Sequence, residues 1–447
     1  MKNLTSGPIQ KQLITLAVPL IIGNILQQLY NTIDALVIGR YAGAAAFAAI
    51  GVAGTIMNLF VFIISGCCTG ISVILAHFYG CGDIRGFGRE TFTALLFGGL
   101  FTGGISLLGI TLLKPLLILI RTPGDVAALT GSYLFIIFAG MFATFLYNFC
   151  SAALRAVGNT SAALIFLAIA AGTNLVLDLV FVAVLHQGIS GAACATVLSQ
   201  ILSVILCFFY MKANFPVLML HRDDICLDRS LLKKTCRYGL VTAMHQSNLY
   251  IGKLLVQASV NSMGTEMIAA YTAATRLEGF ANSFGDSGNA ALSVFIAQNA
   301  GNQSGERIRQ GFAAGCFLLT ALGLVSSAAM YLSSHSAAAF MLGTGSGSSY
   351  LQASSYMRTI AFFYPLCFIG NAFVGYFEGT GRMGIPVLGA TCHITLRVLL
   401  SWLFIGKFGL AAVAGATGLG WLFVVLLWAG IFLYSRQTPA RRESLMK

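Results

Sequence analysis

Charged residues are scarce in this chain of 447 residues. They make up 9% of it, whereas about 25% of a typical soluble protein is charged. Hydrophobic residues make up 57%, and the mean hydropathy is +0.84. No soluble core of this length buries so much apolar surface. The composition therefore excludes a soluble globular protein and predicts an all-α polytopic membrane protein.

The sequence also lacks the spacings that mark reactive or metal-binding sites. Its 11 cysteines form no CxxC pair, so we predict buried thiols rather than a disulfide framework or a metal centre. There is no HExxH or GxSxG motif, and the histidines are dispersed. We therefore expect neither an enzyme nor a protein with a cofactor. The N-terminus has no cleavable signal pattern, so the first span should serve as both signal and membrane helix.

Apolar runs long enough to cross a bilayer occur twelve times along the chain. They fall at 13–38, 47–77, 90–113, 127–154, 160–184, 190–211, 236–261, 267–298, 311–332, 351–377, 384–405 and 410–435. We expect an N-terminal six-helix bundle at 1–211, a cytoplasmic linker at 212–235, and a C-terminal six-helix bundle with a cytoplasmic tail at 236–447.

Basic residues gather on one side of these spans. Most of the 26 lysine and arginine residues fall in segments that are cytoplasmic if the N-terminus lies inside. The positive-inside rule then places both termini of a multi-pass protein in the cytoplasm. The basic residues are not clustered with aromatic residues, so the net charge of +12 does not indicate a nucleic-acid partner.

The two halves of the chain resemble each other. Residues 72–80, SVILAHFYG, match residues 293–301, SVFIAQNAG, at an offset of 221, and Tyr133 matches Tyr356 at an offset of 223. Each half has an even number of spans, so both insert in the same direction, and an axis along the membrane normal should relate them. Pseudo-symmetric bundles with a cleft between them are a transporter architecture. Channels and membrane enzymes contain such repeats less often.

Several segments resemble the multidrug and toxic compound extrusion (MATE) family. They are KQLITLAVPLIIGNILQQLYNTIDALVIGR, GISVILAHFYGCGD, ALRAVGNT, NLVLDLVF and GISGAACATVLSQ. The resemblance implies two six-helix bundles forming a V, and secondary active efflux of organic, often cationic compounds by antiport against H⁺ or Na⁺ with alternating access. It also implies small organic substrates and a monomer in a bacterial cell membrane. A flippase for a lipid-linked or polyprenyl substrate is the alternative, which more spans and a basic cavity would favour.

A polar stripe lies on the first predicted span. Its members are Asn24, Gln27, Asn31 and Asp34. Their spacings of 3, 4 and 3 place them on one helix face, which must face protein or water rather than lipid. Hydrogen bonding between helices explains Asn24 and Gln27 as well as ion binding does. A structural contact would not need the ionisable group of Asp34.

A second polar set lies in the fifth and sixth spans. Asn174 and Asp178 are four residues apart, and Thr196 follows in the next span. The resemblance matches Asp34, Asn174, Asp178 and Thr196 to cation-binding positions of the N-terminal half. Such oxygens suit Na⁺, and two acids in a low-dielectric pocket can instead share a proton. Neither the offset of 221 nor that of 223 places acids in the second half at the positions equivalent to both Asp34 and Asp178. Leu249 stands where one branch of the family has an acid, which weakens the case for sodium.

Four further residues in the predicted spans have open roles. Glu278, Asp286 and Arg397 form either a structural ion pair or a contact with a cationic substrate in a cavity. Pro19 lies in the first span, where a proline permits a kink. That kink is either a static bend or, as the resemblance implies, the point where the first helix bends on protonation.

Overall fold

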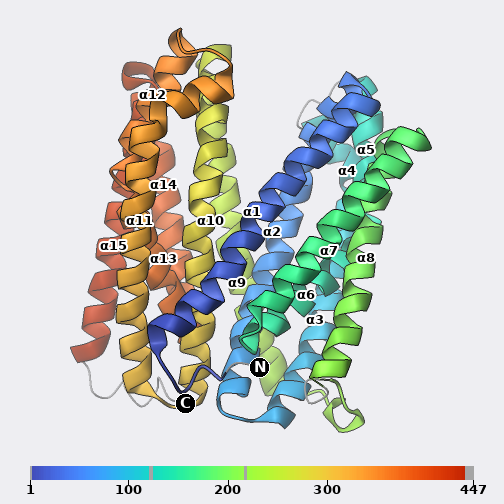
Figure 1. Cartoon of the computed structure of the whole chain (residues 1–447), viewed down its shortest axis with the longest axis vertical. Coiled ribbons are helices and arrows are strands. Elements are labelled where there is room, and N and C mark those ends of the chain that lie inside the picture. The colour runs from blue at the N-terminus through green and yellow to red at the C-terminus, as the bar shows by residue number, and fades with distance from the viewer. Residues whose placement is uncertain (1–2, 120–123, 216–218, 438–447) are drawn as a thin grey trace. The chain divides into compact units, whose positions relative to one another are not determined.

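The computed structural model describes residues 3–119, 124–215 and 219–437 (Figure 1). Within these ranges the chain is helical and contains no strand. Its first half comprises α1 (Ile9–Tyr41), α2 (Ala44–Gly80), α3 (Ile84–Thr111), α4 (Leu113–Leu119), α5 (Gly124–Ala139), α6 (Met141–Ala156), α7 (Thr160–Asp178), the π-helix η1 (Leu179–Val184) and α8 (Gly188–Asn214). Its second half comprises the 3-10 helix η3 (Arg222–Asp224), α9 (Arg229–Asn261), α10 (Thr265–Gly301), α11 (Gly305–Leu342), α12 (Ser348–Ala361), α13 (Tyr364–Gly379), α14 (Gly384–Phe408) and α15 (Leu410–Gln437).

The helices account for the twelve predicted spans. Eight described helices are long and apolar enough to cross a membrane by themselves, and two bent pairs bring that number to ten. The remaining two are α9 and α10, which have 33 and 37 residues. At 1.5 Å per residue, α9 alone is about 50 Å long, which exceeds the hydrocarbon thickness of a bilayer. The prediction of an all-α membrane protein with twelve spans is therefore confirmed.

The described residues divide into two compact units. Among the described residues, unit 1 consists of Asn3 and those of Ile22–Ala243, and unit 2 consists of Leu4–Ile21 and those from Met244 onward. Thus α1 and α9 each contribute residues to both units. The predicted bundle boundaries, with a linker at 212–235, stay a prediction. The predicted tail at 438–447 lies outside the described residues, as does part of the linker.

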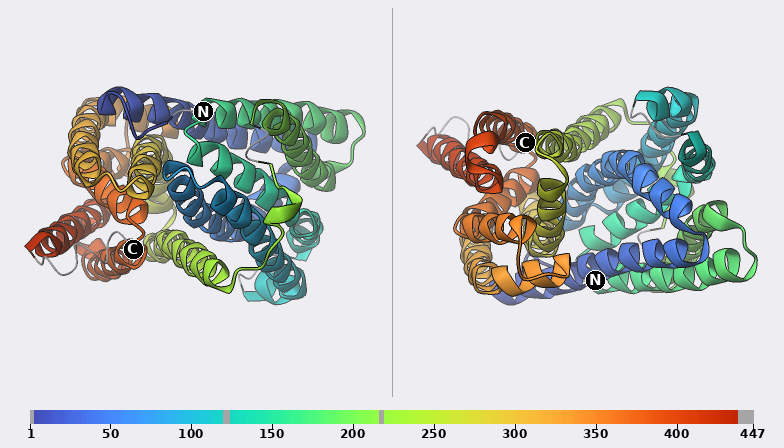
Figure 2. Two further views of the ribbon diagram at one scale, coloured as in Figure 1. Left: turned by 90° about the horizontal axis from the view of Figure 1, so that it is seen from below. Right: turned by 90° about the horizontal axis from the view of Figure 1, so that it is seen from above.

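The two units repeat one packing pattern. In unit 1, α2 packs against α6, α5 against α8, and α7 against α8; in unit 2 the equivalent pairs are α10 with α13, α12 with α15, and α14 with α15. The bent pairs also correspond, because α5 meets α6 at 51° and α12 meets α13 at 53°. Seen along their axes in Figure 2, the helices of each unit lie side by side as a bundle. The repeat read from the sequence thus extends to tertiary contacts.

Small residues set the spacing between α2 and the first turns of α9 in unit 1. Thr242 donates a hydrogen bond from Oγ1 to the carbonyl oxygen of Gly66 at 2.7 Å. A Cβ atom at Gly70 would lie 2.6 Å from the carbonyl oxygen of Tyr238. Small side chains of this kind allow membrane helices to approach closely. The polar backbone groups of α9 can therefore pack directly on α2.

In unit 2, the segment before α1 is anchored to α10 and α11. Leu4 is fully buried, and its carbonyl oxygen accepts hydrogen bonds from Arg307 Nη2 at 3.0 Å and Asn299 Nδ2 at 3.2 Å. Arg307 also donates from Nη1 to the carbonyl oxygen of Gly7 at 3.1 Å and from Nη2 to Gln12 Oε1 at 3.2 Å. One guanidinium group thus holds the turns that lead into α1.

Candidate functional site

Two carboxyl groups come together within unit 1. Asp34 lies on the second half of α1, and Asp178 is the last residue of α7. Asp178 is fully buried and Asp34 is half-buried. The two carboxyl groups are close enough to interact directly. The fold therefore brings together two acids that are 144 positions apart in the sequence.

Asn174 and Thr196 complete this group from neighbouring positions. Asn174 lies one turn before Asp178 on α7, is buried, and donates a long hydrogen bond of 3.4 Å to Thr196 Oγ1 on α8. Thr196 in turn donates to the carbonyl oxygen of Ala192 at 3.0 Å. We call Asp34, Asn174, Asp178 and Thr196 the acid site.

The acid site has more acceptors than donors. Asp34 Oδ1, Asn174 Oδ1 and both carboxyl oxygens of Asp178 are buried and have no hydrogen-bond partner among the described residues. A buried acceptor without a donor is costly, and a buried charge without a partner more so. A bound proton or a small cation would satisfy these oxygens. The donor set of carboxylate, amide and hydroxyl oxygens suits a hard cation such as Na⁺.

Two tyrosines border the acid site, and the sequence reasoning did not assign them to it. Tyr30 on α1 and Tyr133 on α5 each interact with both acids and with the Thr196 hydroxyl. Tyr30 precedes Asp34 by four residues, so helical spacing alone gave a signal for it. Tyr133 carried no such signal, because only the tertiary fold brings α5 to α1.

A π-helix follows Asp178 along the chain. Helix η1 begins directly after this residue, and Leu185 donates its backbone N–H to the Val180 carbonyl oxygen at 2.8 Å. Single π-helical turns within α-helices often occur at functional sites. Val182 of η1 packs with Ile38 of α1 in a small buried cluster. That contact holds the end of α7 against the helix that carries Asp34.

The polar stripe on α1 is not uniform in its surroundings. Asn24 is half-buried and has an interaction partner, whereas Gln27 and Asn31 are exposed. Their supporting role stays a prediction. Pro19 lies inside α1, which continues as a helix through it. The division between the two units falls just beyond it, between Ile21 and Ile22.

The charged residues of the second half separate into two groups within unit 2. Glu278 is buried and accepts a hydrogen bond from Tyr356 Oη at 3.0 Å, while Arg397 Nη2 donates to Tyr271 Oη at 3.3 Å. In the described part of the chain, no salt bridge of 4.0 Å or less involves Arg397 or Glu278. Asp286 is exposed and belongs to a second group, which shares Lys253 with the first.

Asp286 interacts instead with two residues of α9. These are Lys253, which is exposed, and His245, which is buried. His245 Nδ1 in turn lies 3.7 Å from Glu378 Oε1, and both side chains are almost inaccessible. The sequence reasoning did not identify this buried pair. Glu378 lies near the end of α13, and spacing along the sequence does not connect it with α9.

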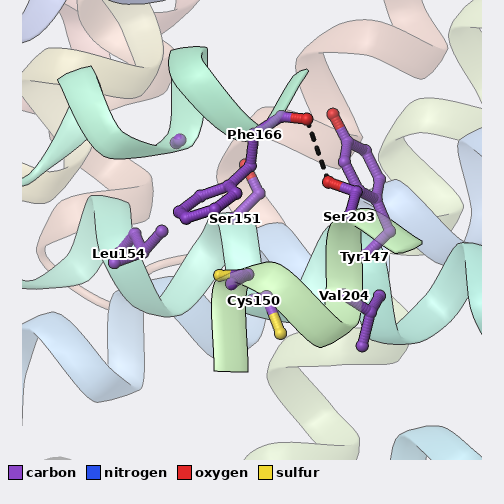
Figure 3. Close-up of a pocket in the computed structure, with 9 residues that line it drawn as sticks. Tyr147, Cys150, Ser151, Leu154, Phe166, Ser203 and Val204 are labelled. Atoms are coloured by element: carbon purple, nitrogen blue, oxygen red, sulfur yellow. Dashed lines mark hydrogen bonds between the residues drawn. The ribbon is translucent and has the colours of Figure 1, made fainter. Parts of the chain in front are cut away.

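The cavities of the two units differ in size. A cavity of about 10 Å³ in unit 1 is bordered by Tyr147, Cys150 and Phe166. Ser203 donates to the Phe166 carbonyl oxygen at 2.9 Å beside it, and Figure 3 shows these side chains. This volume corresponds to about one water molecule and is too small for an organic substrate. In unit 2, an apolar groove of about 350 Å³ lies between α1, α10 and α11.

Comparison with known proteins gives consistent matches along the chain. The sequence profile described as MatE matches residues 19–180 and again residues 242–403. Over 440 residues the chain is 29% identical to the probable multidrug resistance protein YpnP of Bacillus subtilis (strain 168), covering 97% of this chain and 96% of that protein. It is 25% identical over 325 residues to the probable multidrug resistance protein YoeA of the same strain, covering 71% of this chain and 70% of that protein.

Solved structures share the same fold. One is described as the outward-facing conformation of a multidrug resistance MATE family transporter of the MOP superfamily. It aligns with a TM-score of 0.90 at 21% identity, covering 100% of this chain and 99% of that chain. At this identity the likeness concerns the fold alone.

Proposed function

We propose, since the chain belongs to the MATE family of membrane transporters, that it exports small organic, often cationic compounds by secondary active transport. Members of this family are transporters and not enzymes. The export is driven by antiport against H⁺ or Na⁺ and proceeds by alternating access. The named relatives described as multidrug resistance proteins support this substrate class.

The observation that carries the ion coupling is the acid site. Four of its oxygen atoms, on Asp34, Asn174 and Asp178, are buried and have no hydrogen-bond partner among the described residues. When the site is empty, the carboxylates of Asp34 and Asp178 repel each other in a low-dielectric environment. A bound cation or a shared proton removes this repulsion. Ion binding therefore strengthens the contact between α1 and α7 within unit 1, with Asn174 and Thr196 supplying further oxygens.

The position of Asp34 on α1 gives this contact a role in transport. Residues of α1 up to Ile21 belong to unit 2, and those from Ile22 belong to unit 1. An ion that strengthens or releases the contact at Asp34 thus acts on a helix shared by both units. Pro19 removes one backbone hydrogen bond close to this division and makes a bend there less costly.

The chain is a multi-pass membrane protein. The distribution of basic residues favours cytoplasmic positions for both termini, in the cell membrane of a bacterium. We propose that a single chain is the functional unit, because each chain contains both repeats and a complete acid site.

The test is efflux of a fluorescent organic cation from proteoliposomes that contain the purified protein, with proton and sodium gradients imposed separately. We expect one of the two gradients to drive accumulation of the dye against its concentration gradient. Asp34→Asn should reach the membrane and lose this accumulation. Accumulation at the wild-type level by Asp34→Asn, or dye flux that follows only its own gradient in the wild type, would contradict the proposal.

A further inference from the structure

Unit 2 contains a buried group that connects an acid and a base through two tyrosines. Glu278 of α10 accepts a hydrogen bond from Tyr356 of α12 at 3.0 Å, and Arg397 of α14 donates to Tyr271 of α10 at 3.3 Å. The rings of Tyr271 and Tyr356 pack edge to face, with their centroids 5.7 Å apart. We call these four residues the unit 2 cluster.

The repeat places the unit 2 cluster where unit 1 has the acid site. Tyr356 is the counterpart of Tyr133 at an offset of 223, and Glu278 is the counterpart of Met57 at an offset of 221. The structure shows the same contact in both units, because Tyr133 Oη lies 3.9 Å from Met57 Sδ. Tyr133 borders the acid site, so its counterpart marks the equivalent place in unit 2.

The lengths of the helices and of their connections identify the counterpart of Asn174. The offset changes from 223 at Gly158 to 221 at Gly188, so unit 1 has extra residues in this stretch. Helix η1 begins directly after Asp178, whereas α14 in unit 2 is α-helical from Gly384 to Phe408. The stretch Thr160–Val184 and α14 each have 25 residues, and the extra residues lie in the connection to the next helix, which is 185–187 in unit 1 and Gly409 alone in unit 2. The change therefore follows Asp178, and before it the offset of 223 pairs Asn174 with Arg397.

The two units thus differ in charge at equivalent places. The acid site of unit 1 has two carboxyl groups, and Asn174 contributes no charge. In unit 2 the counterpart of Asn174 is Arg397, whose guanidinium is charged at every accessible pH. Besides the tyrosines, Arg397 and Lys253 are the charged groups that act on Glu278, and the effect of Arg397 is the larger. A buried acid within a membrane needs a compensating charge or a proton, and Arg397 supplies that charge from within the chain.

We propose that Arg397 serves in unit 2 as a fixed internal cation. It occupies there the place that the exchangeable ion occupies in unit 1. This proposal rests on the ion site proposed for unit 1. Unit 2 then binds no exchangeable cation, and each chain has one coupling site. Arg397 determines this stoichiometry, and removal of its charge opens a second cation site at Glu278.

The experiment counts cation sites per chain on the purified full-length protein. Three quantities are measured in detergent: bound ²²Na⁺, protons released on Na⁺ addition, and protons released on alkaline titration in excess of those released by Asp34→Asn. Folding is checked by thermal unfolding. We expect one site in the wild type, none in Asp34→Asn, and one again in Asp34→Asn with Arg397→Gln. Adding Glu278→Gln to that variant should remove the regained site. Arg397→Lys in the Asp34→Asn background keeps the fixed charge and should bind none.

The outcomes separate this proposal from the proposed function. A folded Asp34→Asn, Arg397→Gln variant that binds no cation would overturn the role of Arg397, as would two sites in the wild type. A wild type without any site would contradict the ion coupling of unit 1, while the Arg397→Gln arm would still report on unit 2. If Arg397→Gln is unstable in neutral, sodium-free buffer, Na⁺ or acid should restore its stability. Failure of both to do so would also overturn the proposal.

Discussion

Replacing Asp178 by asparagine distinguishes an ion site from a structural contact. Both carboxyl oxygens of Asp178 are buried without a hydrogen-bond partner among the described residues. An ionised acid in the middle of a membrane helix costs about 2.5–3.5 kcal/mol on insertion scales. An amide at this position carries no charge and can donate to Asp34 Oδ1, a hydrogen bond worth about 1 kcal/mol net. At alkaline pH without Na⁺, Asp178→Asn should therefore raise the free energy of unfolding by about 1–3 kcal/mol.

The same substitution should abolish ion-driven transport. A pH gradient of about one unit supplies about 1.4 kcal/mol per coupled proton, which supports a roughly tenfold concentration ratio of substrate. In proteoliposomes with that gradient, or an equivalent sodium gradient, we expect this ratio for the wild type and a ratio of about one for Asp178→Asn. Exchange of labelled for unlabelled substrate, without any ion gradient, should continue.

The matched control for stability is Asp223→Asn, because Asp223 is exposed and lies in η3, outside the predicted spans. We expect its free energy of unfolding to stay within about 0.5 kcal/mol of the wild type. Thermal and denaturant unfolding in detergent measure both variants. A variant Asp178→Asn that is destabilised by about 1–3 kcal/mol would refute the reasoning. That result would mean that the carboxylate has structural partners and that lost transport reflects lost structure.

Two further predictions concern contacts that hold the units together internally. Gly70→Ala should lower the unfolding temperature clearly, because its Cβ would lie 2.6 Å from the backbone of α9. The control is Gly54→Ala on the same helix. Its Cβ would meet nothing within 4 Å, so the unfolding temperature should stay unchanged. Equal unfolding temperatures for both variants would contradict the close packing. Arg307→Ala should speed amide hydrogen exchange around Leu4, since it loses the hydrogen bond to that carbonyl. The control Arg309→Ala removes only an exposed ion pair and should leave this exchange rate unchanged. The same exchange rate around Leu4 in both variants would show that Arg307 does not anchor the segment.

Much of the fold followed from the sequence because lipid imposes simple rules. Each span needs a long apolar run with its backbone hydrogen bonds satisfied internally. The runs therefore correspond to helices almost one to one. Two features escaped these rules. The fourth and tenth spans are each bent by more than 50° between two helices, and α1 and α9 are divided between the units. Both depend on packing partners, which apolar runs do not reveal.

The candidate site was predictable only in part. Helical spacing placed Asn174 and Asp178 on one face, and the resemblance added Asp34 and Thr196. The sequence could not connect Tyr133 with them, because α5 reaches this site only through the packing of unit 1. It likewise gave no sign that the buried polar oxygens lack donors.

What the sequence determined by itself is the class of the protein, its spans, its internal repeat and its unequal distribution of acids. These properties depend on composition and local periodicity, which need no knowledge of contacts. Only the tertiary structure decided which polar groups meet. It joined Asp34 to Asp178 within unit 1, and Glu278 to Tyr356 within unit 2. The physical reason is that the free energy of a buried charge depends on its neighbours in space. Those neighbours come from helices far apart in the sequence.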